Sequence, residues 1–162
     1  MEPIDFVALI DNYYQSKGYP PYRWTVNDDV SLSPLSKPLS ECTVSMLTSG
    51  GISYKIAEPF NPIAKDDFRL DAIDSASADD AFQINDSYYD HRDAEKDLNV
   101  IFPLARLREL ARDRVIGRVA DRLWSGFMGR IYKRQHIIDE AAPRFAEELK
   151  RDGVDAIVMV PA

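Results

Sequence analysis

Hydrophobic residues recur at helical spacing in several stretches of the chain. The pattern predicts a short helix over residues 4–17, which ends at Gly18. Pro103 suits the first turn of a second helix, and a third is predicted over residues 136–151, kinked or restarted at Pro143. The positions expected to face inward are Leu104, Leu107, Leu110 and Ala111 in the second helix and Ile137, Ala141, Phe145 and Leu149 in the third.

The segment after Gly117 has the same spacing, so a further helix is predicted there. Its apolar positions are Val119, Ala120, Leu123 and Trp124. Three other stretches have the composition of β-strands. Residues 43–48 end at a Ser-Gly-Gly turn, and residues 68–73 alternate apolar and polar side chains, as in a half-exposed strand. Residues 154–160 follow Gly153, which suits a helix C-cap, and are almost continuously apolar, as in a strand buried on both faces.

A helix, a glycine turn and a buried strand in succession are typical of α/β proteins. We therefore expect a mainly parallel, Rossmann- or flavodoxin-like sheet with flanking helices. Residues 1–38 form a separate part: the N-terminal helix and a proline-rich extended segment that wraps over the main body. Its large apolar side chains include Tyr19, Tyr22 and Trp24. Residues 39–162 form the compact α/β domain.

Composition and charge narrow the classes of partner. The 162 residues include 20 Lys and Arg and 27 Asp and Glu, which gives a net charge of −7. This negative charge disfavours nucleic acid as a binding partner, because it repels the phosphate backbone. The chain has no apolar run of the roughly 18 residues that a membrane span needs, and no secretory signal is recognised. The single cysteine, Cys42, excludes an intrachain disulfide. Together these features predict a cytoplasmic protein with no membrane partner.

Charge is distributed unevenly along the second half. Residues 66–97 hold eleven acidic side chains, whereas residues 106–134 hold eight arginines and Lys133. The expected arrangement is a solvated face in which the two segments pair, and Arg118 and Arg122 are spaced to share a helix face. An anion site or a surface for an acidic partner is the alternative, because arginine matches carboxylates well.

The first candidate site is the turn that follows the predicted strand 43–48. Carboxyl ends of strands line the ligand crevice of open α/β sheets, and glycines let backbone N–H groups approach a carboxylate or phosphate. The candidate substrate-binding residues are Thr48, Ser49, Gly50 and Gly51. A strand that merely needs a tight turn is the alternative.

The second candidate site is the densest cluster of titratable residues. Its members are Tyr89, Asp90, His91 and Asp93, with Arg92 between them. Histidine beside carboxylates suits proton transfer near neutral pH, and the same groups could bind substrate. A metal and a solvated polar loop stay open as alternatives, although the chain has too few His and Cys for a familiar zinc set, and no metal ligands are assigned. Cys42 is expected to be a small buried hydrophobe rather than a nucleophile.

Several stretches, taken together, resemble one protein family. They are residues 39–41, 47–51, 67–69, 89–94, 97–107, 116–117, 125–129 and 152–156. In this order they are similar to the selenoprotein-B-like subunits of the glycine, sarcosine, betaine and D-proline reductases. The most specific stretch is Asp-x-Asn-Val-x-Phe-Pro-Leu-x-Arg-Leu over residues 97–107. The resemblance covers roughly residues 39–162.

The resemblance implies reductive cleavage of a small amino acid bound as an amine or imine. In that family a cysteine or selenocysteine of the B-type subunit attacks carbon and displaces nitrogen, a second thiol resolves the adduct, and an external dithiol resets the pair. The reactive residue lies just after the strand that matches residues 154–160. This sequence reaches only Pro161 and Ala162 there, and it has Asp86, Ser87 and Tyr88 where the family often carries extra histidines.

These observations lead to three hypotheses. The first is a subunit of a reductase-like enzyme that cleaves a C–N or similar bond, with the reactive Cys or Sec on a partner chain and no firmly bound cofactor. Self-association through the C-terminal side of the sheet is the other expected arrangement. The second hypothesis is a non-catalytic binding or regulatory module that keeps the family fold. The third is a metal-assisted lyase or hydrolase that uses Asp90, His91 and Asp93.

Overall fold

The computed structural model describes residues 4–21, 28 and 33–161 of the chain. It divides into two compact units, Met1–Pro34 and Leu35–Ala162. The first unit contains helix α1 (Phe6–Ser16), which is capped by the Asp5 carboxylate accepting a hydrogen bond from Ala8 N at 3.0 Å. The predicted N-terminal helix is therefore confirmed.

The segment after α1 turns at Gly18, whose φ of +86° is in the left-handed region that favours glycine. No described residue of α1 is buried, and Tyr19 is 62% exposed. Tyr22 and Trp24 lie outside the described residues. That this segment wraps over the main body stays a prediction.

The second unit is built on a five-stranded sheet. Strand β1 (Thr43–Thr48) lies at its centre and pairs in parallel with β7 (Ala156–Val160), β5 (Arg118–Val119) and β6 (Arg122–Gly126). Strand β3 (Leu70–Asp74) pairs antiparallel with the outer side of β6. The chain is therefore a mixed α/β protein with a mostly parallel sheet, as predicted.

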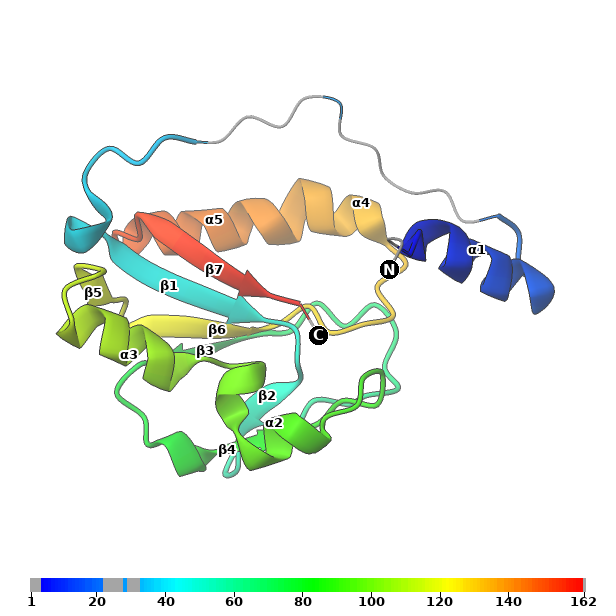
Figure 1. Cartoon of the computed structure of the whole chain (residues 1–162), viewed down its shortest axis with the longest axis horizontal. Helices are drawn as coiled ribbons and strands as arrows, with labels where there is room; N and C mark the ends of the chain where they lie inside the picture. Colours follow the sequence, from blue (N-terminus) through cyan, green and yellow to red (C-terminus); the bar gives the residue numbers. More distant parts are fainter. Residues whose placement is uncertain (1–3, 22–27, 29–32, 162) are drawn as a thin grey trace. The chain divides into compact units, whose positions relative to one another are not determined.

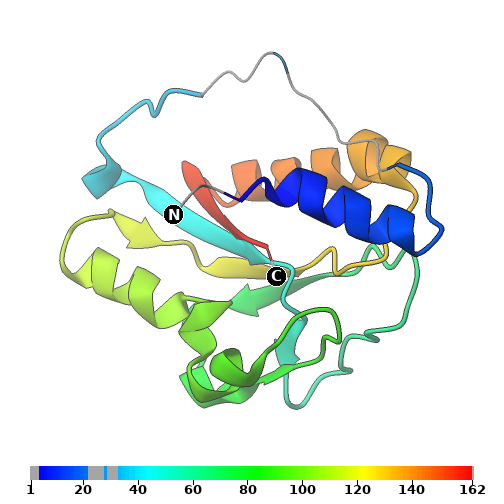
Figure 2. The same cartoon turned by 45° about the vertical axis from the view of Figure 1, so that its right-hand side comes forward.

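Helices cover both faces of this sheet (Figures 1 and 2). On one face lie α2 (Arg92–Lys96), α3 (Leu104–Arg112), the short helix η3 (Leu98–Val100) and the hairpin of β2 (Ile52–Tyr54) and β4 (Phe82–Ile84). On the other face one long helix comprises α4 (Arg134–His136), a π-helical turn (Ile137–Ala141) and α5 (Ala142–Arg151). Short 3₁₀ turns occupy Leu39–Glu41 and Asp79–Ala81. In the part of the chain that the structure describes, no helix has the length and apolar character needed to cross a membrane.

Alternate residues of β1 point into two separate hydrophobic cores. Val44 and Met46 belong to the larger core, which includes Leu104 and Leu107 of α3, with Ala111 packed against it, as expected. Leu110, which was also expected to face inward, is 38% exposed. Leu47 belongs to a smaller core on the opposite face. Because both faces are covered, every residue of β1 is buried, and the strand shows no alternation of buried and exposed positions.

The long helix confirms the predicted inward face. Phe145 is buried, and Ile137, Ala141 and Leu149 are each less exposed than the residues on the opposite side. The predicted disturbance near Pro143 takes the form of the π-helical turn immediately before α5. Proline lacks the N–H that an α-helix needs at this point, and the wider turn accommodates the loss without ending the helix.

The predicted helix after Gly117 is wrong, because this segment forms β5 and β6. Leu123 lies in the larger core and Trp124 in the smaller one, so β6 is apolar on both faces. Adjacent apolar residues of a strand buried on both sides imitate helical spacing. Consequently Arg118 and Arg122 lie on strands and do not share a helix face.

The prediction that residues 154–160 form an interior strand is also wrong. Within the described residues β7 pairs with β1 alone, which makes it an edge strand. Val158 is 39% exposed and Met159 is 63% exposed. An apolar run therefore did not imply burial on both faces at this position.

The expected pairing between the acidic and basic segments is found at one arginine. Arg108 contacts Asp79 at 2.7 Å and also donates to the carbonyls of Ser75 and Ser77. Three other arginines pair with acids one or three positions away: Arg106 with Glu109, Arg112 with Asp113, and Arg118 with Asp121. Arg122 pairs with Glu148 and Asp152 and thereby links β6 to the end of the long helix.

Candidate functional site

The glycine turn lies at the carboxyl end of the central strand, as predicted. Gly51 has a φ of +68°, and a Cβ atom there would lie 2.4 Å from the carbonyl oxygen of Asn85. The backbones approach closely because Asn85 N donates to the Gly51 carbonyl at 2.9 Å. Glycine is thus required here by backbone conformation and by packing.

The side chains around this turn differ in what they offer a ligand. Thr48 is fully buried, and its hydroxyl oxygen accepts a hydrogen bond from Gly50 N at 3.1 Å. Ser49 is half-buried, and its N–H donates to the Val160 carbonyl of β7 at 3.2 Å. The turn therefore lies beside the carboxyl end of β7, and Ser49 is the more accessible hydroxyl.

One hydrogen bond joins the two candidate segments. The Tyr89 hydroxyl donates to the Gly50 carbonyl oxygen at 3.0 Å. Burial, with a smaller contribution from the nearby Asp86 carboxylate, raises the pKa of Tyr89 to about 12. The phenol therefore stays protonated near neutral pH and serves as a donor that holds the turn.

His91 lies next to Tyr89 and reaches a carboxylate that the sequence reasoning missed. The two rings meet edge to face with centroids 6.0 Å apart. The His91 Nδ1 atom lies 2.8 Å from Glu95 Oε1, although the N–H is not aligned for a hydrogen bond. His91 is the N-cap residue of α2, and its i, i+4 spacing from Glu95 is the pattern that could have identified this pair.

The other two members of the cluster point elsewhere. Asp90 pairs with Arg92, whose Nε donates at 2.8 Å, and hydrogen bonds from Arg92 hold the pKa of Asp90 below its usual range. Asp93 pairs with Lys96 at 2.9 Å, and all four side chains are exposed. The structure thus joins Tyr89 to the turn, places His91 beside the Tyr89 ring, and leaves the two aspartates in local ion pairs.

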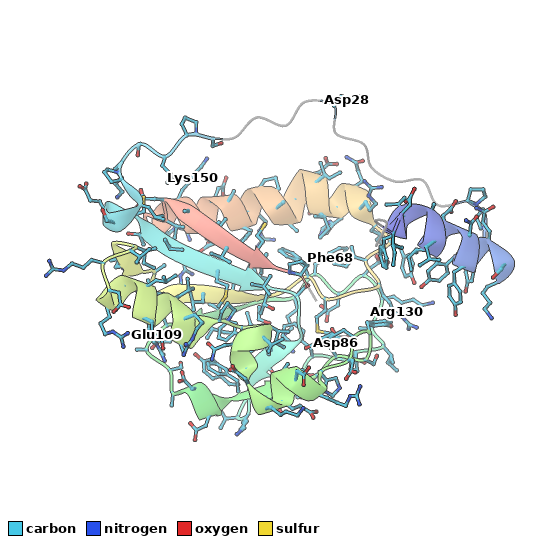
Figure 3. All side chains as sticks on the ribbon, viewed as in Figure 1. Asp28, Phe68, Asp86, Glu109, Arg130 and Lys150 are labelled. Atoms are coloured by element: carbon cyan, nitrogen blue, oxygen red, sulfur yellow. The ribbon has the colours of Figure 1, made fainter. Side chains whose placement is uncertain are left out.

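Two buried polar atoms near the turn have no hydrogen-bond partner among the described residues. One is Oδ1 of Asn85, whose backbone contacts Gly51, and the other is Oγ of Ser125, which is paired in register with Thr48. Leaving such a group unsatisfied costs about 1–3 kcal/mol, so a polar ligand atom or a water would be stabilised here. Figure 3 labels Asp86, the residue after Asn85, near the carboxyl ends of the strands.

Cys42 lies at the other end of β1. It is fully buried, and its thiol is 3.4 Å from the carbonyl oxygen of Pro38. This placement agrees with the expectation of a small buried hydrophobe. Within residues 4–21, 28 and 33–161, no three His, Cys, Asp or Glu side chains converge on one point where a metal could bind.

Comparison with known proteins gives the family. Residues 9–162 match the family described as glycine/sarcosine/betaine reductase selenoprotein B. The chain belongs to this family. The chain is 33% identical over 140 residues to the D-proline reductase subunit gamma of Acetoanaerobium sticklandii, which covers 86% of the chain and 53% of the relative.

Two further relatives of this family match at similar identity. The sarcosine reductase complex component B subunit beta of Peptoclostridium acidaminophilum is 31% identical over 85% of the chain and 32% of the relative. The glycine reductase complex component B subunit gamma of Symbiobacterium thermophilum is 29% identical over 82% of the chain and 31% of the relative. The chain thus spans about half the length of the first relative and about a third of the other two. No solved structure matches the chain.

Proposed function

We propose that this chain is a subunit of a reductase that binds a small amino acid, or a related amine or imine, and takes part in reductive cleavage of its C–N bond. The substrate would lie at the carboxyl ends of β1 and β7, where Rossmann- and flavodoxin-like sheets bind their ligands. The relatives, which are named as subunits of D-proline, sarcosine and glycine reductases, support this role.

The observation that carries the proposal is the Tyr89–Gly50 hydrogen bond of 3.0 Å. This contact supports the proposal because it joins the turn of residues 48–51 to Tyr89, two positions before His91, and because Ser49 N donates to Val160 at the end of β7. The family resemblance puts the reactive thiol or selenol just after the strand equivalent to β7. A nucleophile delivered there would meet the turn that holds the substrate.

The reactive sulfur or selenium is proposed to come from a partner chain, because Cys42 is buried at the opposite end of β1. The thiolate or selenolate attacks the substrate carbon while the C–N electron pair leaves with nitrogen. A proton must then reach the departing nitrogen, and His91 is the side chain suited to supply it. A second thiol then attacks the sulfur or selenium and forms an S–S or S–Se bond, while the electron pair of the broken C–S or C–Se bond leaves with carbon, which takes up the proton of that thiol. An external dithiol reduces the resulting S–S or S–Se bond and is itself oxidised to a disulfide.

The test uses the assembled enzyme isolated from native cells, with its partner identified by mass spectrometry. His91→Ala should lower substrate turnover by about a hundred- to ten-thousandfold, as expected for a general acid. The matched control is His136→Ala, because His136 also contacts a glutamate at i, i+4 spacing, Glu140 at 3.2 Å. Turnover that is equal in the two variants would contradict the proposed role of His91.

A binding or regulatory module is the second candidate. It is favoured by one observation, which is that the sequence contains a single cysteine and the structure buries it. Under this alternative the chain binds the small ligand, yet no isolated complex containing it cleaves a C–N bond. Binding measured by calorimetry, together with absence of turnover in the purified complex, would decide for the module.

A further inference from the structure

A groove lies on the face of the sheet opposite the candidate reductase site. It has a volume of about 660 Å³ and runs between the β3–β6 pair and the long helix. Its lining includes Phe68, Trp124, Phe127, Arg144, Phe145 and Glu147. Figure 3 labels Phe68 beside α4, where its ring contacts His136 with centroids 4.1 Å apart. The volume is typical of small-molecule sites.

The floor of the groove is aromatic. The Phe145 ring meets Trp124 at 5.3 Å and Phe127 at 6.3 Å, both edge to face. Phe127 has a φ of +52°, a conformation that costs a bulky residue energy, and the π-helical turn supplies Ala141 to the same wall. Backbone features of both kinds are found preferentially at functional sites.

Trp124 lines the groove, but its hydrogen-bond donor is enclosed. Its side chain is buried, at 4% exposure for the residue, and its Nε1 atom has no partner among the described residues. An unpartnered donor of this kind is destabilising unless something accepts its hydrogen. Because the Nε1 atom is itself buried, this donor lies behind the wall of the groove and does not select the ligand.

Most charges at the rim are already paired. Arg122 contacts Glu148 at 2.8 Å and Asp152 at 2.6 Å, and His136 contacts Glu140 at 3.2 Å. Arg151 also contacts Glu148, at 2.5 Å. These pairs hold the helix to the sheet and leave little charge for a ligand.

Two opposite charges at the rim remain. Arg144 and Glu147 both line the groove, and neither side chain makes an ion pair or hydrogen bond with any described residue. They are three positions apart on α5, so they are neighbours on one helix face. A cation and an anion side by side disfavour the binding of a ligand with a single charge, because one of the two side chains repels it. They favour a ligand that carries both a negative and a positive group.

We propose that this groove binds a free amino acid with an apolar side chain. The Arg144 guanidinium takes the carboxylate, the Glu147 carboxylate takes the ammonium group, and the side chain packs on Trp124, Phe127 and Phe145. Arginine suits the first role because its planar group donates two parallel hydrogen bonds to a carboxylate. This site is separate from the proposed reductase site and does not rest on it.

The test is a binding titration with L-phenylalanine, followed by the fluorescence of Trp124. The chain has two tryptophans, so Trp24→Phe leaves Trp124 as the single reporter. In that background Arg144→Gln and Glu147→Gln should each weaken L-phenylalanine binding about fivefold or more, as expected for partly exposed charged hydrogen bonds. Circular dichroism confirms that each variant is folded.

Two truncated probes separate the roles of the two charges. Arg144→Gln should weaken the binding of phenylacetate, which has only the carboxylate, and leave the binding of phenethylamine unchanged. Glu147→Gln should weaken the binding of phenethylamine and leave that of phenylacetate unchanged. Arg112→Gln is the control, because Arg112 pairs with Asp113 outside the groove. The proposal is overturned by three results: no fluorescence change with L-phenylalanine at millimolar concentration, binding that neither variant weakens, or phenylacetate binding as tightly as L-phenylalanine.

Discussion

Replacing Gly51 with alanine tests whether the close approach of the glycine turn to Asn85 organises the candidate site. The matched control is Gly153→Ala, because Gly153 has nearly the same φ, +66° against +68°. Nothing lies within 4 Å of a Cβ atom built on Gly153, whereas one on Gly51 would lie 2.4 Å from Asn85 O and 2.8 Å from Asn85 C. The two variants therefore share the conformational penalty and differ in the clash.

The expected magnitudes follow from these distances. The left-handed conformation costs alanine about 1–2 kcal/mol, partly offset by a less flexible unfolded chain, so Gly153→Ala should lose about 1 kcal/mol. Gly51→Ala must in addition move the backbone of residue 85, which disturbs the 2.9 Å hydrogen bond from Asn85 N to the Gly51 carbonyl. The total loss should be about 3–5 kcal/mol, within the range of severe substitutions.

Urea unfolding followed by circular dichroism measures both losses. Thermal unfolding should show a melting temperature lower by roughly 10 °C for Gly51→Ala and by about 3 °C for Gly153→Ala. If the two variants are equally stable, the turn does not depend on its contact with Asn85. The tight approach would then play no part in positioning residues 48–51.

Three further predictions concern single side chains. Tyr89→Phe removes the donor to the Gly50 carbonyl and should cost about 1 kcal/mol in urea unfolding, because that carbonyl is left unsatisfied. Cys42→Ser should leave turnover of the assembled enzyme within about twofold, because the thiol lies at the far end of β1 from the proposed site. Asp155→Asn should lower the free energy of unfolding near pH 7 and have a diminishing effect as the pH falls below about 3.9, because a hydrogen bond from Lys37 lowers the pKa of Asp155.

Each of these has an outcome that contradicts it. Unchanged stability of Tyr89→Phe would mean that water replaces the hydroxyl, and a hundredfold loss of turnover in Cys42→Ser would make that thiol the nucleophile. For Asp155, a carboxylate with a depressed pKa stabilises the fold above the unfolded-state value of about 3.9 and stops doing so as the pH falls through the folded-state value. A difference between wild type and Asp155→Asn that grows as the pH falls would have the wrong sign.

The sequence predicted the elements whose two faces differ in chemistry. The helix over residues 136–151 was readable because Phe145 and Leu149 face the sheet while its other side is charged. β6 was misread because Leu123 and Trp124 are buried on opposite faces, which removes the alternation that marks a strand. The exposure of β7 was missed because an apolar run does not indicate whether a strand pairs with neighbouring strands on one side or on both.

For the candidate site, the position of the Gly50–Gly51 turn after β1 was predicted because glycines after a strand are informative. His91 was chosen because it lies in the densest cluster of titratable residues, and its role in a site stays a prediction. The sequence could not show that Tyr89 donates to Gly50, since 39 residues separate them and only the fold brings them together. Asn85 and Ser125 were missed for a similar reason. Only the fold shows that the side-chain oxygens of these residues are buried without a hydrogen-bond partner among the described residues.

The unequal sizes of the two cores have a consequence for motion. On one face many apolar residues pack beneath α3, whereas on the other the buried residues are Leu47, Trp124 and Phe145, with a few half-buried neighbours. Separating α5 from the sheet therefore exposes less apolar surface than global unfolding and should occur at a lower free energy. Amides of residues 142–151 would then exchange hydrogen faster than those of β1, and the groove between the helix and the sheet would open without loss of the larger core.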